Sequence, residues 1–179
     1  MMHQDLLKIT HTEETIKART AELAAEIRRD YEGKDPIFIG VLKGAYIFMA
    51  ELCKNVDIPC EMAFVYASSY RGTTTTGEVR ANLDFLPDLK GRHIIVVEDI
   101  LDTGLTLKKL CDGLRSFGAA SLEICALLDK PSRRRVEMTG KYVGFEIPDE
   151  FVVGYGLDYN EFYRNLPYVG VLKPEVYQD

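Results

Sequence analysis

Three carboxylates and two threonines lie close together near the middle of the chain. Glu98 and Asp99 follow the apolar run Ile94–Val97, and Asp102 precedes the Thr-Gly-Leu-Thr turn at 103–106. A carboxylate can accept a proton or bind Mg²⁺, whereas the backbone N–H groups of a tight turn before a helix bind phosphate. Because carboxylates repel phosphate, we expect the acids to act through a cation or sugar hydroxyls and the turn to hold a phosphate. The alternative is a solvated acidic loop that caps a helix.

The residues around these acids predict a strand, a turn and a helix, in that order. Ile94–Val97 contains only β-branched residues, which is typical of a strand buried on both faces. In an open parallel sheet, ligands bind at the carboxyl ends of strands, and the amino end of the next helix attracts anions. The predicted elements therefore place the acids and the turn where a ligand site is expected. Apolar residues at helical spacing follow at Leu107, Leu110, Cys111, Leu114 and Phe117.

A second strand-to-helix turn carries a cation. Residues 36–42 predict a buried strand, Lys43 and Gly44 follow it, and residues 45–54 predict a helix. A lysine at the start of a helix opposes the helix dipole, so its position is better explained if an anion binds there. A surface lysine in an ordinary turn is the alternative.

Two further segments place polar residues after predicted strands. Residues 121–128 predict a buried strand that leads to Lys130, and the segment 151–164 contains Asp158 and Arg164. Strands alternate with helices along the chain, which predicts an α/β domain with a parallel core sheet. We expect these polar residues to meet at the carboxyl ends of the strands.

The remaining pattern predicts further elements and one polar loop. Residues 10–13 have the form of a capping box at the start of a helix over residues 12–32. The segment 68–78 is polar and contains two glycines, so it cannot bury enough apolar surface to order itself. It is either a floppy hairpin loop or a lid that closes over substrate and excludes water. Further strands are expected over residues 60–67, 80–85, 142–145 and 168–172.

Length and charge limit the possible classes of function. A chain of 179 residues is expected to form one domain, over residues 1–179. The net charge of -6 and the pI near 5.2 argue against a general affinity for nucleic acid or for anionic membranes. The basic run Arg133–Arg135 is too short to change this conclusion and is interpreted as a solvated loop. No apolar run of about 18 residues is present to span a membrane.

The cysteines and histidines argue for a reducing compartment and against a zinc site. The four cysteines form no Cys-x-x-Cys pair and have apolar neighbours, so we expect buried thiols in a cytoplasmic protein. The three histidines are scattered and lack the spacing of metal ligands. Residues 1–5 lack a basic region followed by an apolar stretch, so we expect no secretory signal peptide.

Five stretches of the chain resemble one enzyme family. The string at 94–106 resembles the phosphoribosyl-diphosphate signature of the type I phosphoribosyltransferases: an apolar strand, two acids, two apolar residues and Asp-Thr-Gly-x-Thr. The turn at 42–44 is similar to the diphosphate-binding loop of the members that act on purines, and residues 69–70 to the Ser-Tyr pair of their mobile loop. Residues 143–149 and 151–164 resemble the subgroup that acts on hypoxanthine and guanine.

The resemblance implies a fold and a reaction. The fold would be the type I phosphoribosyltransferase fold, a central and mainly parallel sheet flanked by helices, with a small hood and a mobile active-site loop. The reaction would be a step of purine salvage. It would transfer 5-phosphoribosyl from phosphoribosyl diphosphate to N9 of hypoxanthine, and of guanine, giving IMP or GMP and diphosphate. Such an enzyme would need Mg²⁺ and would form a homodimer or a homotetramer.

The resemblance also implies roles for individual residues. Asp102 would be the catalytic base, which accepts the proton at purine N7. Glu98, Asp99 and Asp158 would support the metal, and the peptide bond before Lys43 would be cis. The residues expected to bind substrate are Lys43, Gly44, Ser69, Tyr70, Glu98, Asp99, Asp102, Thr103, Gly104, Leu105, Thr106, Lys130, Phe151, Val152, Asp158 and Arg164.

Recognition of the base would depend on three of these residues. The ammonium of Lys130 can only donate hydrogen bonds, so it would bind the carbonyl at purine C6 and reject adenine. Phe151 would stack on the purine, and the backbone of Val152 would read its edge. The alternative for Lys130 is a solvated residue at a strand end. Two positions depart from the family: Leu105 stands where some relatives carry lysine, and Arg71 follows the Ser-Tyr pair.

Two other functions stay open from the sequence. The same fold could act on another base, namely xanthine, adenine or a pyrimidine. It could also have been retained in a regulator that binds RNA. The acidic pI argues against the regulator, because RNA binding depends on cations that neutralise phosphates.

Overall fold

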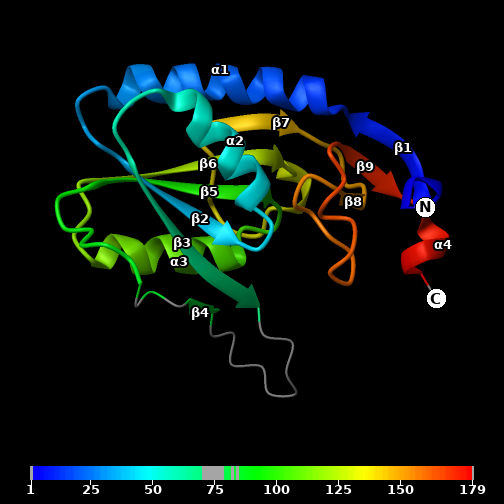
Figure 1. Cartoon of the computed structure of the whole chain (residues 1–179). Helices are drawn as coiled ribbons and strands as arrows, with labels where there is room; N and C mark the ends of the chain where they lie inside the picture. Colours follow the sequence, from blue (N-terminus) through cyan, green and yellow to red (C-terminus); the bar gives the residue numbers. More distant parts are fainter. Residues whose placement is uncertain (1, 70–78, 82, 84, 179) are drawn as a thin grey trace.

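A six-stranded sheet forms the centre of the molecule, in the order β4-β3-β2-β5-β6-β7 (Figure 1). This computed structural model describes residues 2–69, 79–81, 83 and 85–178, without the side chains of 68, 69 and 79–81. The strands from β3 to β7 run parallel, and β4 pairs antiparallel with β3 at one edge. The strands are β2 Ile37–Leu42, β3 Glu61–Ser69, β4 Val79–Ala81, β5 His93–Leu101, β6 Ser121–Asp129 and β7 Tyr142–Glu146.

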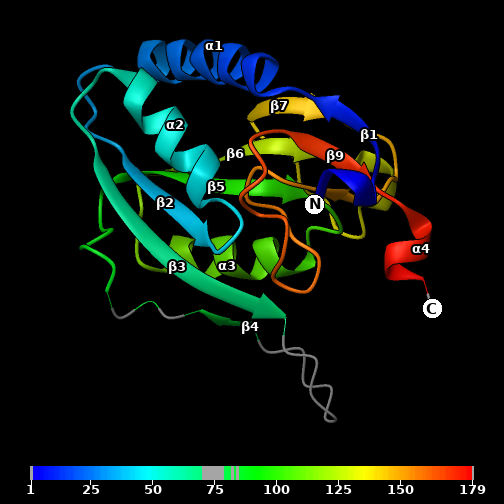
Figure 2. The same cartoon turned by 45° about the vertical axis from the view of Figure 1, so that its right-hand side comes forward.

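Helices cover both faces of this sheet. Figures 1 and 2 show α1 (Glu13–Tyr31) and α2 (Tyr46–Val56) on one face and α3 (Leu105–Ser116) on the other. The apolar run of β5 therefore alternates between two cores. Ile95 and Val97 pack with α1 and α2, whereas Ile94 and Val96 pack with α3. Burial on both faces explains why the predicted strand has no polar alternation.

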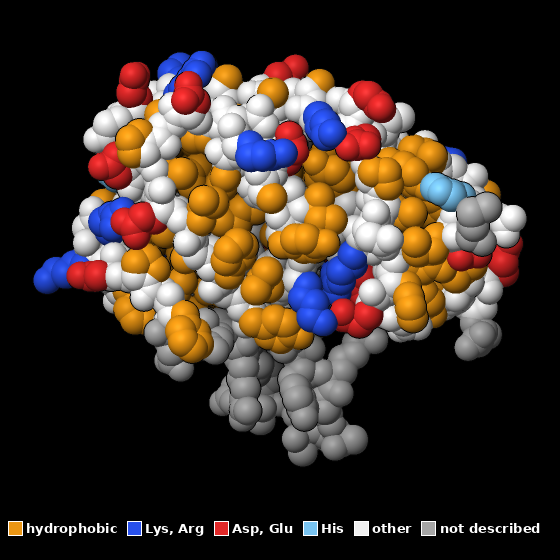
Figure 3. All heavy atoms as spheres, in the orientation of Figure 1, with side chains coloured by type: hydrophobic (Ala, Val, Ile, Leu, Met, Phe, Trp, Pro, Cys, Tyr) orange, Lys and Arg blue, Asp and Glu red, His pale blue; other side chains and the backbone are white. Residues whose placement is uncertain are grey.

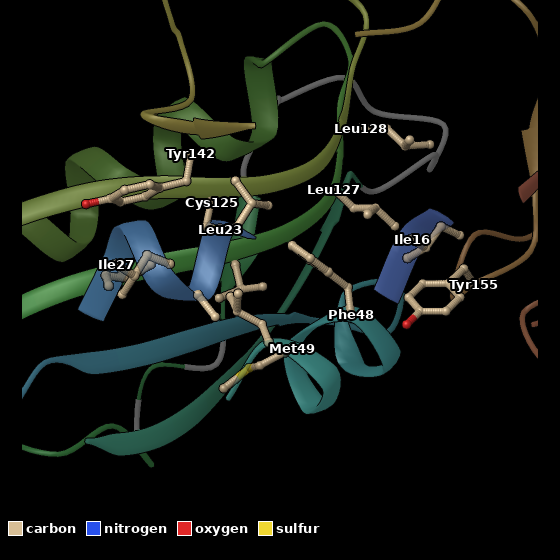
Figure 4. Packing of buried hydrophobic residues seen from close by; sticks show 14 of the residues in the cluster. Ile16, Leu23, Ile27, Phe48, Met49, Cys125, Leu127, Leu128, Tyr142 and Tyr155 are labelled. Atoms are coloured by element: carbon tan, nitrogen blue, oxygen red, sulfur yellow. The ribbon is translucent and has the colours of Figure 1, made fainter. Parts of the chain in front are cut away.

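The first of these cores packs closely. Figure 4 shows Leu23 and Ile27 of α1 beside Phe48 and Met49 of α2, with Cys125 of β6 among them. All five side chains are buried. Burial of apolar side chains at this density gives the sheet a rigid frame, which holds the loops at its carboxyl edge.

A second, smaller sheet lies beside the carboxyl ends of the central strands. It contains β1 (Leu6–His11), β9 (Val169–Leu172) and β8 (Val152–Val153), paired antiparallel in that order. Figures 1 and 2 show this sheet joining the first and last parts of the chain. It is the small hood that the family resemblance implies. Three short helices complete the description: the 3-10 helices η1 Met2–Asp5 and η2 Pro131–Arg133, and α4 Pro174–Tyr177.

The fold confirms the predicted α/β architecture with its parallel core sheet and helices on both faces. It also corrects several boundaries. The N-cap of α1 is Thr12, whose hydroxyl accepts a hydrogen bond from the backbone N–H of Thr15 at 3.3 Å, so Thr10 is not the capping residue. Of the strand expected over residues 80–85, the described residues show β4 at Val79–Ala81, and residues 82 and 84 lie outside the described part of the chain. Strands β1 and β8 were not predicted.

Strand β5 is longer than its apolar run predicted. It continues through Glu98 and Asp99 to Leu101, because it pairs with β6 from His93 as far as Leu101. Glu98 and Asp99 are therefore part of the strand rather than of the turn after it. Phe117, which continued the helical spacing, is the C-cap of α3 and is half-exposed. None of the helices in the described part of the chain is long and apolar enough to cross a membrane.

Candidate active site

The loop after β2 reaches the carboxylates of β5. The peptide bond between Leu42 and Lys43 is cis, as the family resemblance implies. A Cβ atom built on Gly44 would overlap with the Asp99 carboxylate, so only glycine fits at this position. A Cβ atom on Gly156 would in turn overlap with the carbonyl oxygen of Gly44. Three segments that are far apart in the sequence thus meet at the carboxyl end of the sheet.

Glu98 and Asp99 form a partly buried acidic pair at this meeting point. The backbone N–H of Asp99 donates to Glu98 Oε1 at 3.1 Å, and the backbone N–H of Ile100 donates to Asp99 Oδ1 at 2.7 Å. Desolvation raises the pKa of both carboxyls, and the charge of Asp99 raises the pKa of Glu98 further. Arg164 acts in the opposite direction on the pKa of Asp99. A bound cation would stabilise the charged forms, so the pair suits a divalent metal.

The turn at 103–106 forms an amide cradle. Strand β5 ends at Leu101, and α3 begins at Leu105 with Gly104 as its N-cap, at φ 78°. Glycine adopts this left-handed conformation without steric cost and has no side chain to cap the helix. The N–H of Leu105 makes only a long contact with Thr103 Oγ1, at 3.5 Å, and the helix dipole favours an anion next to the first N–H groups of α3. The cradle can hold a phosphate close to Thr103 and Thr106.

Asp102 lies between this cradle and the loop after β6. Its Oδ1 accepts a hydrogen bond from Arg133 Nε at 3.0 Å. Arg134 donates to the backbone carbonyls of Leu101, at 2.9 Å, and of Asp102, and also pairs with the carboxylate of Asp129. The interpretation of this basic run as a solvated loop is therefore wrong for Arg134. Its side chain is largely buried, and it donates to two backbone carbonyls and a carboxylate at this edge of the sheet.

Lys130 is a buried cation next to Asp102. The residue is 7% exposed, and its Nζ donates to the carbonyl of Glu150 at 2.6 Å, with Asp149 Oδ1 at 3.9 Å. Its backbone N–H donates to the carbonyl of Leu101 at 3.0 Å, which ties the loops after β5 and β6 together. Burial lowers the pKa of the Lys130 ammonium. The alternative that this lysine is a solvated residue is therefore wrong.

The segment after β8 supplies a further cation of the site, Arg164. Arg164 Nη2 lies 2.9 Å from Asp158 Oδ1, and its Nη1 donates to the carbonyl of Gly156 at 2.8 Å. Its Nε is buried and has no hydrogen-bond partner among the described residues. An unpaired buried donor is costly, so this position favours an anionic ligand. Asp158 and Arg164 come from the loop after β8 of the hood, not from a strand of the central sheet.

This geometry agrees with three comparisons. The family model for the phosphoribosyl transferase domain matches residues 8–160. The chain belongs to the phosphoribosyl transferase family. It is 49% identical over 179 residues to a hypoxanthine-guanine phosphoribosyltransferase of Staphylococcus aureus, covering 99% of this chain and 100% of the relative. It is 50% identical to one of Streptococcus pneumoniae, with both chains covered completely. A crystal structure of a hypoxanthine phosphoribosyltransferase from S. aureus has a TM-score of 0.95, with 49% identity, and covers 99% of this chain and 97% of the other.

Two residues of this phosphoribosyltransferase chain that were predicted to contact the base lie in or next to β8 of the hood. Val152 is buried in β8, paired with Val171 of β9. Phe151 is partly exposed, as a stacking platform requires. The structure places both residues near Lys130, because the carbonyl of Glu150 accepts the hydrogen bond of the lysine.

Sequence reasoning missed an aromatic residue from the C-terminal helix. Tyr177 of α4 stacks on Phe151, with ring centroids 4.7 Å apart, and Tyr159 packs edge-on against Phe151 at 5.8 Å. The only signal was the aromatic character of residue 177, which has no nearby motif. Arg133 and Arg134 were visible as a charge run but were not assigned to the site.

One group of predicted residues stays largely untested by the structure. Ser69 is the last residue of β3, and its side chain lies outside the described residues, as does the whole of Tyr70. The predicted lid falls almost entirely in the same segment.

The predicted metal residues do not form a complete cage. No group of three or more histidine, cysteine, aspartate or glutamate side chains that could hold a metal is found in the described part of the phosphoribosyltransferase chain.

Proposed function

We propose that this enzyme transfers 5-phosphoribosyl from phosphoribosyl diphosphate to N9 of hypoxanthine and guanine, giving IMP or GMP and diphosphate. The observation that carries the choice of base is the buried Lys130. Its ammonium uses one donor on the carbonyl of Glu150 and has others for a ligand. A carbonyl at purine C6 accepts such a hydrogen bond, whereas the amino group of adenine does not.

Asp102 is the proposed catalytic base. The purine must lose a proton as N9 attacks the ribose, and a carboxylate next to Lys130 can accept it from N7. Arg133 donates to Oδ1 of the Asp102 carboxylate, which leaves Oδ2 to accept the proton of the purine. Phe151 provides the stacking face, and the backbone of Val152 reads the purine edge. Ser69 and Tyr70 belong to the lid that excludes water from the oxocarbenium-like ribose.

The phosphates of the substrate have separate binding groups. The amides of Thr103, Gly104, Leu105 and Thr106 hold the 5-phosphate at the start of α3. Lys43, with Gly44, and Arg164 bind the diphosphate, because both cations lie at the loop contact of Gly44 with Gly156. These cations neutralise the charge that develops on the leaving group.

The acids of the site support a requirement for Mg²⁺. Lys43 and Arg164 lie among four carboxylates, those of Glu98, Asp99, Asp158 and Glu161. Such an excess of negative charge repels a diphosphate unless a cation accompanies it. Oxygen ligands from carboxylates suit Mg²⁺, which usually keeps few protein ligands and several from phosphates. Mg²⁺ would bind near Glu98 and Asp99, with Asp158 through water, and would supply charge neutralisation at the diphosphate.

The assembly and compartment are also part of this proposal. Tyr46, Met62, Phe64 and Tyr66 are exposed on α2 and β3. Figure 3 shows hydrophobic side chains gathered on the face that these elements form. Exposed apolar patches of this kind mark association surfaces, so a homodimer or homotetramer is expected. The four free cysteines fit a reducing cytoplasm.

The test is a panel of bases with phosphoribosyl diphosphate and Mg²⁺, with nucleotide formation as the readout. Hypoxanthine and guanine should be turned over, and adenine should be rejected by about 10⁴–10⁵-fold, because it offers no acceptor to the N–H groups of Lys130 that Glu150 leaves unused. Adenine used as well as hypoxanthine would contradict the proposal.

The same panel in excess chelator tests the metal. Nucleotide formation should stop and should return when Mg²⁺ is restored. Full activity in chelator would remove Mg²⁺ from the proposal, while the assignment of the base would still depend on the panel.

A further inference from the structure

Glu161 joins the two cations that are assigned to the diphosphate. Its Oε2 lies 2.8 Å from Lys43 Nζ, across a sequence separation of 118 residues, and its Oε1 lies 3.3 Å from Arg164 Nη2. One carboxylate therefore bridges a cation of the central sheet and a cation of the loop after β8. This is the position that two oxygens of a diphosphate would take between the same cations.

Local hydrogen bonds hold the turn that carries this carboxylate. Asn160 and Glu161 have φ values of 50° and 68°, in the left-handed region. The backbone N–H of Glu161 donates to Asp158 Oδ2 at 2.9 Å, and Tyr159 and Phe162 exchange backbone hydrogen bonds at 3.2 and 3.0 Å. Residues other than glycine seldom adopt this conformation without such support. These hydrogen bonds therefore stabilise the turn that carries Glu161, and they hold its backbone next to Lys43.

Charge keeps the contact in place at neutral pH. The hydrogen bond with Lys43 lowers the pKa of Glu161, and the same bond raises the pKa of Lys43. Both groups stay charged across the neutral range. Their side chains are 62% and 51% exposed, and ion pairs of this kind contribute little to stability. The main consequence of the contact is that Glu161 occupies both cations, so another anion must displace it to bind there.

We propose that Glu161 holds the diphosphate position in the free enzyme and is displaced when phosphoribosyl diphosphate binds. The inference rests on the proposed function, which assigns Lys43 and Arg164 to the diphosphate. A diphosphate with its metal carries more charge and more acceptor oxygens than one carboxylate, so the exchange favours the substrate. When the diphosphate product leaves, Glu161 pairs with the cations again. It therefore lowers the affinity for diphosphate and speeds its release.

The test compares wild type with Glu161→Gln in titrations with inorganic diphosphate and Mg²⁺ at fixed salt. Glutamine keeps the size of the side chain and removes its charge. We expect the Kd of diphosphate to fall about two- to fivefold, the range for an exposed ion pair, and the KM for phosphoribosyl diphosphate to fall with it. The KM for hypoxanthine should not change. The dissociation rate of diphosphate should decrease.

Glu22→Gln is the matched control. Glu22 is 65% exposed and pairs with Arg19 at 2.7 Å on α1, away from the site, so its replacement should leave diphosphate affinity unchanged. Weaker diphosphate binding in Glu161→Gln would overturn the inference, because Glu161 would then support the ligand. Unchanged binding would overturn it as well. A wild type that makes no nucleotide from any base would instead overturn the proposed function, whereas the titration decides the role of Glu161 separately.

Discussion

The proposed base side and the proposed diphosphate side of this site are built in different ways. On the base side, Lys130 is buried against the carbonyl of Glu150, and Asp102 is held by Arg133. On the diphosphate side, Lys43 and Glu161 form an exposed ion pair. The contrast is between two ammonium groups: that of Lys130 is buried and tied to a backbone carbonyl, whereas that of Lys43 pairs with an exposed and flexible side chain.

The difference follows from what each side binds. A neutral purine offers a few hydrogen bonds, so its recognition depends on donors and acceptors that are in place beforehand. A diphosphate with its metal offers strong charge, so its cations can be held by temporary partners until it arrives. The base side, with its fixed donors and acceptors, therefore discriminates between bases. The diphosphate side, whose ion pair can be exchanged, binds and releases diphosphate. The following three experiments test this division, starting with the largest expected effect.

Asp102→Asn should give the largest loss. The amide oxygen can still accept the hydrogen bond from Arg133, so the loop geometry is kept, but the residue can no longer accept the purine proton. We expect kcat to fall about 10²–10⁴-fold with little change in thermal stability. Steady-state kinetics and thermal unfolding measure both quantities. Asp112→Asn on the outer part of α3 is the control and should keep wild-type kcat. Near-normal turnover of Asp102→Asn with saturating substrates would remove Asp102 from the role of base.

Lys130→Met tests whether the buried ammonium reads the base. The loss of a hydrogen bond from a charged donor costs about 1.5–3 kcal/mol, so kcat/KM for hypoxanthine should fall about 10–100-fold. The KM for phosphoribosyl diphosphate should change little, since Lys130 belongs to the base side. Lys8→Met is a matched control, because Lys8 pairs with the side chain of Glu150 at 2.6 Å from the exposed side. An equal loss of kcat/KM for hypoxanthine and for phosphoribosyl diphosphate in Lys130→Met would contradict the division into two sides.

Glu98→Gln should give the smallest effect of the three on the free enzyme, where it changes stability. Desolvation and the charge of Asp99 raise the pKa of Glu98, so the folded state favours the neutral acid. Stability from this group is present at low pH and is lost as the pH rises through the raised pKa. The variant avoids this loss, so its unfolding midpoint should exceed that of wild type at alkaline pH.

A pH series of thermal unfolding for both proteins measures this difference. It should shrink as the pH falls, because wild-type Glu98 is then neutral too. Phosphoribosyl diphosphate with Mg²⁺ should also reduce it, since a bound cation stabilises the charged pair. A variant less stable than wild type at every pH would show that the charge of Glu98 is already compensated in the free enzyme.

Much of this site could be predicted because its residues are close together in the sequence. Glu98, Asp99, Asp102 and the turn at 103–106 lie on one strand end and one helix start, and local pattern is enough to place them. Lys43 and Lys130 could be predicted for the same reason, since each directly follows a buried strand. The ends of the strands could not be predicted in the same way. Strand β5 continues past its apolar run because pairing with β6, not hydrophobicity, decides where it ends.

The sequence by itself determined the parallel core, the strand ends that carry the acids and the amide cradle. Only the tertiary structure decided which side chains meet across loops. Arg133 reaches Asp102 from the loop after the next strand, Glu161 reaches Lys43 across most of the chain, and Tyr177 stacks on Phe151 from the C-terminal helix. These contacts have no periodicity or spacing that local pattern can detect. The contact of Glu161 with Lys43 depends on how the hood packs on the central sheet, whereas the other two join neighbouring loops and the C-terminal helix. All three are set by packing between segments that are distant in the sequence.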